Sequence, residues 1–283
     1  MLIMQVNKYA FADCKFEISS DSPIVAEGYY GSFAADFTTP DYSIRVKRVS
    51  ELPEKQGNCV YEYDKGSLYI GDATRKFKAF IDMKTRANAD FACLENETDL
   101  YVKHSGEITE FVVFESLDLP DLLLKKGIAI LHCSYIEVDG EAILFAGDKQ
   151  VGKSTQAALW QNYKGAQVRN GDRAGVFVRD GRVYACGVPY CGTSGICHNV
   201  VLPVRAIVGL SRGTENVISG ISILESVLFL LNKIAYNYWD RAASDTAFSI
   251  IENICKSVDF ITYSCRKDES AVDCLYDFLK KGN

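Results

Sequence analysis

Residues 147–155 constrain this chain more than any other part of its sequence. Their letters, GDKQVGKST, fit the pattern G-x-x-x-x-G-K-[ST]. An apolar run at 141–146 is expected as a buried strand before them, and the good helix formers of 154–161 as a helix after them. Strand, glycine-rich loop and helix together aim backbone N–H groups at an anion. A chance match in a glycine-containing turn is the alternative, but the flanking elements favour a phosphate-binding loop.

The residue types of this loop suit a bound nucleotide. Gly147 and Gly152 allow backbone angles that a side chain would forbid, and the amides between them can form a concave anion nest. Lys153 supplies a positive charge for β- and γ-phosphates, Ser154 offers a hydroxyl to Mg²⁺, and Thr155 is a second candidate oxygen ligand. ATP and Mg²⁺ are therefore the expected cofactors. The predicted nucleotide-binding residues are Gly147, Asp148, Lys149, Gln150, Val151, Gly152, Lys153, Ser154 and Thr155.

Composition and charge exclude several other kinds of protein. The chain has 283 residues, of which 48% are apolar and 24% charged, which is ordinary for one large or two modest globular domains. Its net charge of −6 argues against a broad electrostatic grip on nucleic acid or on an anionic membrane. No apolar run reaches about 18 residues, so no spanning helix is expected. Neither nucleic acid nor membrane is predicted as a partner.

The cysteines and the first residues bear on the compartment. None of the ten cysteines forms a C-x-x-C pair. Cys186, Cys191 and Cys197 with His198 have metal-ligating residue types, but their spacing is irregular, which favours free thiols over a zinc site. The first residues, MLIMQVNKYAFADC, lack the basic region and small-residue cleavage site of a signal peptide. A cytoplasmic protein is therefore expected.

The patterns of apolar and turn residues predict two domains. Residues 1–116 consist of short runs rich in β-branched and aromatic residues, including 108–114, and predict a β-rich N-terminal domain of unknown role. Residues 117–283 alternate predicted strands with helices, among them a helix over 223–235. Asp-Gly pairs at 139–140 and 180–181 are strong hairpin signals. Consecutive hairpins favour an α/β domain with a mixed sheet over an all-parallel one.

The C-terminal half resembles the HPr kinase and phosphoenolpyruvate carboxykinase superfamily, more narrowly its HPr-kinase-related branch. GDKQVGKST looks like the GDSGVGKSE loop of HPr kinases, and His132 precedes Gly147 by the interval at which they carry a histidine. VRNGDR follows at about the interval of their second acidic motif. PVRAIVGLSRGTENVI and DFITYSCRKDESAVDCLYDFL are similar to stretches of HPr-kinase-related proteins. The resemblance covers 125–283 and implies a carboxykinase-like P-loop fold for 117–283, an ATP-dependent kinase activity and a homo-oligomer as an option.

Three departures from the family pattern bear on the substrate. Gly171 stands where the first of two neighbouring aspartates would be, and Thr155 replaces the glutamate after the loop serine. VPYCGTSG occupies the part of the chain where HPr kinases carry E-I-R-G. HPr is therefore a poor candidate substrate. A serine of a peptide or protein, as in related kinases of ribosomal peptide biosynthesis, fits at least as well.

Lys153, Asp172 and His132 are the predicted catalytic residues. Asp172 is expected to bind the metal together with Ser154, or to act as a base; the alternative is a turn residue in Asn-Gly-Asp. His132 is either a core histidine or a base and phosphate partner near neutral pH. Arginines are candidates for neutralising phosphate, with an ordinary surface charge as the alternative. They are Arg173, Arg205 and Arg212.

The leading hypothesis is an enzyme that phosphorylates a serine hydroxyl of a peptide or protein. A nucleotide-sensing module without turnover is the second, motivated by the lost acid at Gly171. A small-molecule kinase or a carboxykinase-like enzyme is the third, although the extended metal and substrate constellation of carboxykinases is not found in the sequence.

Overall fold

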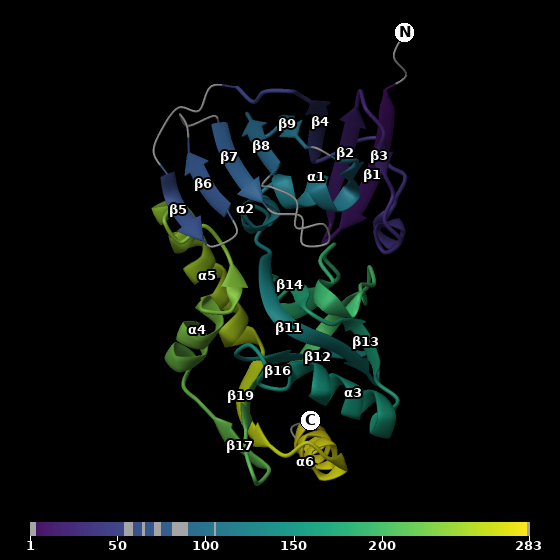
Figure 1. The fold of residues 1–283 in the computed structure, drawn as a ribbon. Helices are drawn as coiled ribbons and strands as arrows, with labels where there is room; N and C mark the ends of the chain where they lie inside the picture. The colour runs from purple at the N-terminus through teal and green to yellow at the C-terminus, as the bar shows by residue number, and fades with distance from the viewer. Residues whose placement is uncertain are drawn as a thin grey trace. The chain divides into compact units, whose positions relative to one another are not determined.

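The chain divides into two compact units, Met1–Leu119 and Pro120–Asn283, which we call the N-terminal and C-terminal units (Figure 1). The structure, a computed structural model, describes residues 4–53, 59–63, 66–70, 75–80, 90–104 and 106–281, with only the backbone described between residues 59 and 92. The N-terminal unit is β-rich, and the C-terminal unit combines helices with mixed sheets, as the sequence predicted.

An eight-stranded sheet forms the N-terminal unit, with strand order β1-β2-β4-β9-β8-β7-β6-β5. The pairs β2–β4 and β4–β9 are parallel, and the other neighbours are antiparallel. Two short strands, β3 and β10, form a separate parallel pair. The bounds are β1 Gln5–Phe11, β2 Cys14–Ser20, β3 Ile24–Val25, η1 Tyr30–Phe33, β4 Tyr42–Arg48, β5 Cys59–Tyr63, β6 Gly66–Ile70, β7 Arg75–Phe80, β8 Asp90–Glu95, β9 Asp99–Lys103 and β10 Ile108–Thr109.

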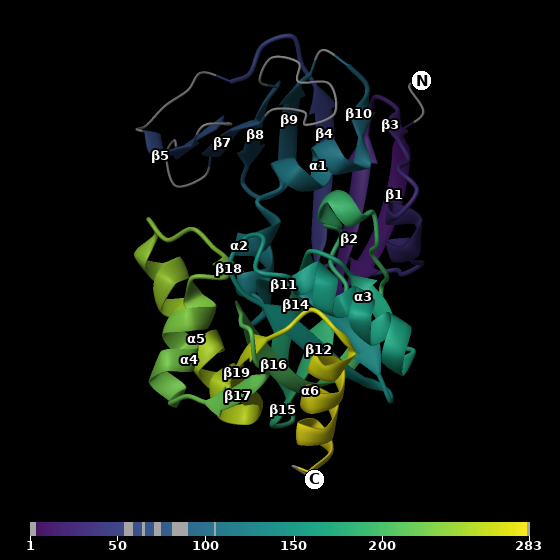
Figure 2. The same cartoon turned by 60° about the horizontal axis from the view of Figure 1, so that its bottom comes forward.

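The expectation of a strand over residues 108–114 is wrong beyond Thr109, because helix α1 (Glu110–Ser116) begins there. The Thr109 hydroxyl accepts the N–H of Val112 at 3.3 Å and so caps the first turn. The Phe114 ring packs against aromatic rings from β1 and β2, where α1 lies against the sheet (Figure 2). A short apolar run has no period that separates a strand from a buried helix, and here the cap and the packing decide.

Two long strands of the C-terminal unit, β11 and β16, are each shared by two sheets. The first half of β11 pairs with β14 and β18, and its second half pairs with β12 and β13. Strand β16 pairs first with β15, then with β12 and β19, and β17 pairs with β19. Among the described strand pairs of the C-terminal unit, only β12–β16 and β16–β19 are parallel, so the sheet is mixed as expected. The bounds are β11 Ala129–Val138, β12 Glu141–Ala146, β13 Gln167–Asn170, β14 Arg173–Arg179, β15 Arg182–Cys186, β16 Val201–Arg212, β17 Val217–Gly220, β18 Ile234–Ala235 and β19 Asp259–Cys265.

The helices of this unit cover both faces of the sheet. Helices α3 and α6 pack on one face and α4 and α5 on the other; Figures 1 and 2 show α4 and α5 together, away from α3. Within β12, Ile143 and Phe145 join the core under α3 and α6, whereas Leu144 joins the core under α4 and α5. Because neighbouring side chains of a strand point to opposite faces, burial of both faces explains the uninterrupted apolar run. The bounds are α2 Leu119–Leu124, α3 Lys153–Lys164, η2 Gly192–Ser194, α4 Ile223–Leu231, α5 Arg241–Ser257 and α6 Glu269–Lys281.

None of the helices in the described part of the chain combines the length and the apolar character needed to cross a bilayer.

The two Asp-Gly pairs form the predicted hairpin turns. Asp139 and Gly140 have φ of 52° and 78°, and Asp180 and Gly181 have φ of 50° and 74°. Positive φ at both central residues is the requirement of a type I′ turn. The turns join β11 to β12 and β14 to β15, which delivers β12 to the glycine-rich loop.

Helix α4 is shorter than the predicted 223–235. It ends at Leu231, and residues 234–235 form β18 against β11 instead. The N–H of Lys233 donates to the carbonyl of Leu230 at 2.8 Å, which tightens the turn after the helix. Pairing with β11 therefore overrides helix propensity at this point, and it brings Lys233 beside the strand that carries His132.

Candidate functional site

The loop between β12 and α3 depends on its two glycines. Gly147 has φ of 152°, and a Cβ placed on it would lie 2.9 Å from Val151 Cγ1 and 3.1 Å from the carbonyl oxygen of Leu210. Gly152, which precedes the first residue of α3, has φ of 122°. Both values fall where glycine is favoured, so the loop needs glycine at both positions.

Lys153 carries a buried positive charge at the start of α3. Its side chain folds back over the loop, and Nζ donates to the carbonyl oxygens of Gly147 at 2.9 Å and Asp148 at 3.1 Å. Burial lowers the pKa of Lys153, while Cys133 and Asp172 act in the opposite direction. Among the described side chains, none caps the first turn of α3, and that turn contains no acidic residue. Uncapped helix amides and an ammonium group therefore share one loop, an arrangement that suits an anion.

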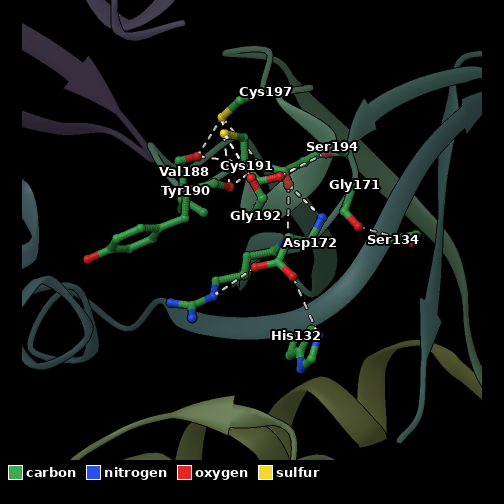
Figure 3. Close-up of polar contacts among 12 residues, drawn as sticks. His132, Ser134, Gly171, Asp172, Val188, Tyr190, Cys191, Gly192, Ser194 and Cys197 are labelled. Atoms are coloured by element: carbon green, nitrogen blue, oxygen red, sulfur yellow. Dashed lines mark hydrogen bonds and ion pairs between the residues drawn. The ribbon is translucent and has the colours of Figure 1, made fainter. Parts of the chain in front are cut away.

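His132 and Asp172 lie together on neighbouring strands. His132 is opposite Arg173 in the pairing of β11 with β14, and its Nε2 is 3.6 Å from Asp172 Oδ1 (Figure 3). That distance is longer than a hydrogen bond. Burial lowers the pKa of His132, as does the charge of Lys153, so the imidazole is neutral near pH 7. A neutral imidazole and a carboxylate are both able to accept a proton there.

Asn170 positions Asp172, a role that sequence reasoning missed. The fully buried Asn170 accepts, at its Oδ1, the backbone N–H groups of Asp172 at 2.9 Å and Arg173 at 3.0 Å. Its Nδ2 donates to the carbonyl oxygen of Tyr190 at 2.8 Å. Asn-Gly-Asp is typical of a turn, and a turn explains the bonds from the N–H groups of Asp172 and Arg173 to Asn170. The bond to Tyr190 depends on how residues 187–199 fold back, which no local pattern indicates.

Residues 188–195 occupy the space of a second acidic residue beside Asp172. A Cβ on Gly171 would lie 2.3 Å from Ser194 Oγ and 2.7 Å from Ser194 Cβ. Gly192, with φ of 56°, packs so closely that its own Cβ would lie 2.8 Å from Asp172 Cβ. Figure 3 shows Gly192 and Ser194 next to the turn that contains Gly171 and Asp172. The glycine at position 171 is therefore a packing requirement of this segment.

The predicted arginines have different surroundings. Arg212 donates to the backbone oxygen of Gln150 and so touches the loop. Arg173 lies beside Asp172, with Nε 3.3 Å from Oδ2. Arg205 instead donates to the backbone oxygen of Leu279, near the end of α6.

A further cation, Lys233, was not foreseen. Its Nζ is 2.5 Å from Asp148 Oδ1, the second residue of the loop. The contact lowers the pKa of Asp148. The two residues are 85 positions apart, and the early end of α4 and the pairing of β18 with β11 place Lys233 near the loop.

Two of the predicted residues, Ser154 and Asp172, are the candidates for binding a metal ion. Ser154 is exposed on the first turn of α3, and Asp172 is half-buried. No three His, Cys, Asp or Glu side chains of the described residues gather as metal ligands. Mg²⁺ fits such a site, because it keeps several waters and takes one or two carboxylates together with phosphate oxygens.

The cysteines near the site are thiols. None of the cysteines with described side chains forms a disulfide, and the side chain of Cys59 lies outside the described ones. Cys197 Sγ donates to the carbonyl oxygen of Val188 at 2.8 Å, and burial raises its pKa to about 12. A neutral thiol bonded to the backbone is a poor zinc ligand.

Comparisons with known proteins give little further information about what these residues do. No protein-family model matches the chain, and no curated protein does. Among solved structures it is similar to the Hpr(Ser) kinase/phosphatase from Coxiella burnetii, at 12% sequence identity over 54% of this chain and 94% of that chain, with a TM-score of 0.32. A likeness at that TM-score carries no argument, so the case for a function rests on the residues of the loop and its neighbours.

Proposed function

We propose that this protein is an ATP-dependent phosphotransferase that acts on a serine hydroxyl of a peptide or protein. The observation that carries the proposal is the placement of Lys153. It is only 8% exposed, its ammonium is held by the carbonyls of Gly147 and Asp148, and no described side chain caps the helix that it begins. A buried cation next to uncapped amides is costly without an anion and favourable with one.

The residues around this loop suit transfer of a phosphoryl group. Mg-ATP would supply that group, with the metal neutralising charge on its oxygens. Ser154 and Asp172 would hold Mg²⁺, and the loop amides and Lys153 would hold the phosphates. The acceptor proton would pass to Asp172 or to the neutral His132, which stand 3.6 Å apart. The serine acceptor follows the resemblance of the loop and of His132 to those of HPr kinases.

A second candidate function, nucleotide binding without transfer, is favoured by one contact. Ser194 fills the space that a side chain at Gly171 would need, so an acidic side chain at position 171 does not fit beside Asp172. If Asp172 cannot hold the metal and also activate a hydroxyl, the protein binds nucleotide without transferring its phosphate. This candidate predicts tight binding and no labelled product.

Binding and transfer are tested separately. Isothermal calorimetry with Mg-ATP compares the unaltered protein with Lys153→Met, which keeps the buried stem and removes the charge. Lys256→Met is the matched control, because Lys256 is on α5 and pairs only with Glu252 in the described structure. We expect Lys153→Met to weaken binding at least about tenfold, the effect of losing one charge-assisted contact. Equal binding by both proteins would remove the phosphate-loop assignment.

Transfer is then followed with ATP labelled at the γ-phosphate and a library of serine peptides. The same peptides with alanine in place of serine are the control, and a panel of small metabolites tests the rival acceptors. Label on serine peptides alone supports the proposal. Tight binding with no label on any acceptor would favour the nucleotide-sensing module.

A further inference from the structure

Lys233 is fixed beside the loop by its backbone. Its N–H donates to the carbonyl oxygen of Leu230 at 2.8 Å, and its own carbonyl oxygen accepts the N–H of His132 at 2.8 Å. The side chain, 18% exposed, reaches Asp148, where Nζ is 2.5 Å from Oδ1. Lys233 therefore joins the end of α4, the strand of His132 and the second residue of the loop.

Two ammonium groups meet at Asp148. Lys153 bonds its carbonyl oxygen at 3.1 Å, and Lys233 bonds its carboxylate. Both charges also act on His132, and each lowers the pKa of that imidazole. The positive charge around the loop thus comes from two separate parts of the chain.

The partners of the Lys233–Asp148 pair differ in exposure. The Asp148 side chain is 85% exposed, so its carboxylate can turn into solvent, whereas the Lys233 backbone is held on both sides. An ion pair with one such exposed partner contributes little stability. A phosphate with more negative charge can therefore replace the carboxylate at small cost.

We propose that Lys233 binds the terminal phosphate of a nucleoside triphosphate and that Asp148 occupies its ammonium group until the nucleotide arrives. The inference rests on the proposed nucleotide-binding function. Lys153 belongs to the loop and serves the β- and γ-phosphates. Lys233 comes from the side of His132 and Asp172, toward which a transferred phosphoryl group would move. The terminal phosphate is therefore the one that meets Lys233.

The test measures binding of Mg-ATP and Mg-ADP by calorimetry at one fixed salt concentration, for Lys233→Met, Lys233→Arg, Asp148→Asn and the Lys256→Met control. We expect Lys233→Met to weaken Mg-ATP binding about tenfold or more and Mg-ADP binding less than about threefold. Asp148→Asn should strengthen Mg-ATP binding about two- to fivefold, because the competing carboxylate is gone. Lys233→Arg should keep most of the preference for ATP, and the control should match the unaltered protein.

The outcomes separate this inference from the function on which it rests. If the unaltered protein binds neither nucleotide, both fail. If Lys153→Met weakens binding while Lys233→Met does not, the loop assignment stands and the role of Lys233 is wrong. Equal weakening of Mg-ATP and Mg-ADP by Lys233→Met would also overturn the terminal-phosphate assignment. Thermal unfolding of each variant shows that a loss of binding is not a loss of fold.

Discussion

Replacing Gly171 with alanine tests whether residues 188–195 exclude a side chain next to Asp172. The φ of Gly171 lies outside the left-handed region, so alanine meets no backbone strain there. Its cost comes from contact alone, because the new Cβ would be 2.3 Å from Ser194 Oγ and 2.7 Å from Ser194 Cβ. The hydroxyl can rotate away, but the Cβ moves only with its segment.

The size of the effect follows from these contacts. Rotation of Ser194 Oγ gives up its bond to the carbonyl oxygen of Cys191 at 2.7 Å and its bond from the N–H of Ile196 at 3.2 Å. Each is worth about 1 kcal/mol, and displacing the crowded Cβ adds about 1–3 kcal/mol. We expect Gly171→Ala to cost about 3–5 kcal/mol, which lowers the melting temperature of a unit of this size by about 6–20 °C.

Ser194→Gly provides the matched background, because it removes both crowding atoms. In that background Gly171→Ala should cost less than about 1 kcal/mol, so the two changes are strongly coupled. Urea unfolding followed by tryptophan fluorescence measures the coupling. Both tryptophans, Trp160 and Trp239, lie in the C-terminal unit, so the signal follows that unit.

Two results would refute this reasoning. One is an unfolding free energy of Gly171→Ala equal to that of the unaltered protein. The other is an equal cost in both backgrounds, which would mean that Ser194 is not the obstacle. If the coupling is found, an aspartate at position 171 also needs Ser194→Gly to fit.

Three further predictions concern other parts of the site. Because burial holds the pKa of His132 below its unfolded value, the unfolded chain takes up a proton before the folded chain does as the pH falls. The free energy of unfolding should therefore decrease below about pH 6.5. In urea unfolding measured over a pH series, His132→Gln should show a smaller decrease in that range. Gly147→Ala should cost about 2–4 kcal/mol by urea unfolding and remove Mg-ATP binding. The control Gly165→Ala should cost about 1 kcal/mol, because φ there is 66° but no atom crowds the new Cβ. Similar costs for the two variants would contradict the close approach of Gly147 to Leu210. Asn170→Ala should cost about 2–4 kcal/mol in thermal unfolding, because it leaves the part-buried N–H groups of Asp172 and Arg173 without their acceptor. A loss under about 1 kcal/mol would contradict the role of Asn170.

Local features of the sequence were sufficient for much of the C-terminal unit. The Asp-Gly pairs at 139–140 and 180–181 adopt the positive φ that their hairpins need. Residues 141–146 form the buried strand, and the helix after the loop begins at Lys153. Such features are set by backbone angles and by the period of apolar residues over a few positions, so they can be predicted without the rest of the chain.

Local features failed where packing chooses between alternatives. Residues 108–114 are apolar without a clear period, and Phe114 became helical because its ring fits the aromatic core of the N-terminal unit. Helix α4 stops early because residues 234–235 pair with β11. In both places the competing structures are close in local free energy, and burial against distant strands decides.

The sequence by itself determined the glycine-rich loop, its lysine and the hairpins that lead to it. Tertiary structure alone decided which groups surround them: Lys233 on Asp148, Ser194 against Gly171 and Asn170 beneath Asp172. A loop motif is encoded by the backbone angles of consecutive residues. Contacts between residues far apart in the chain depend on strand pairing and on the fit of whole segments, which become defined only when the core is packed.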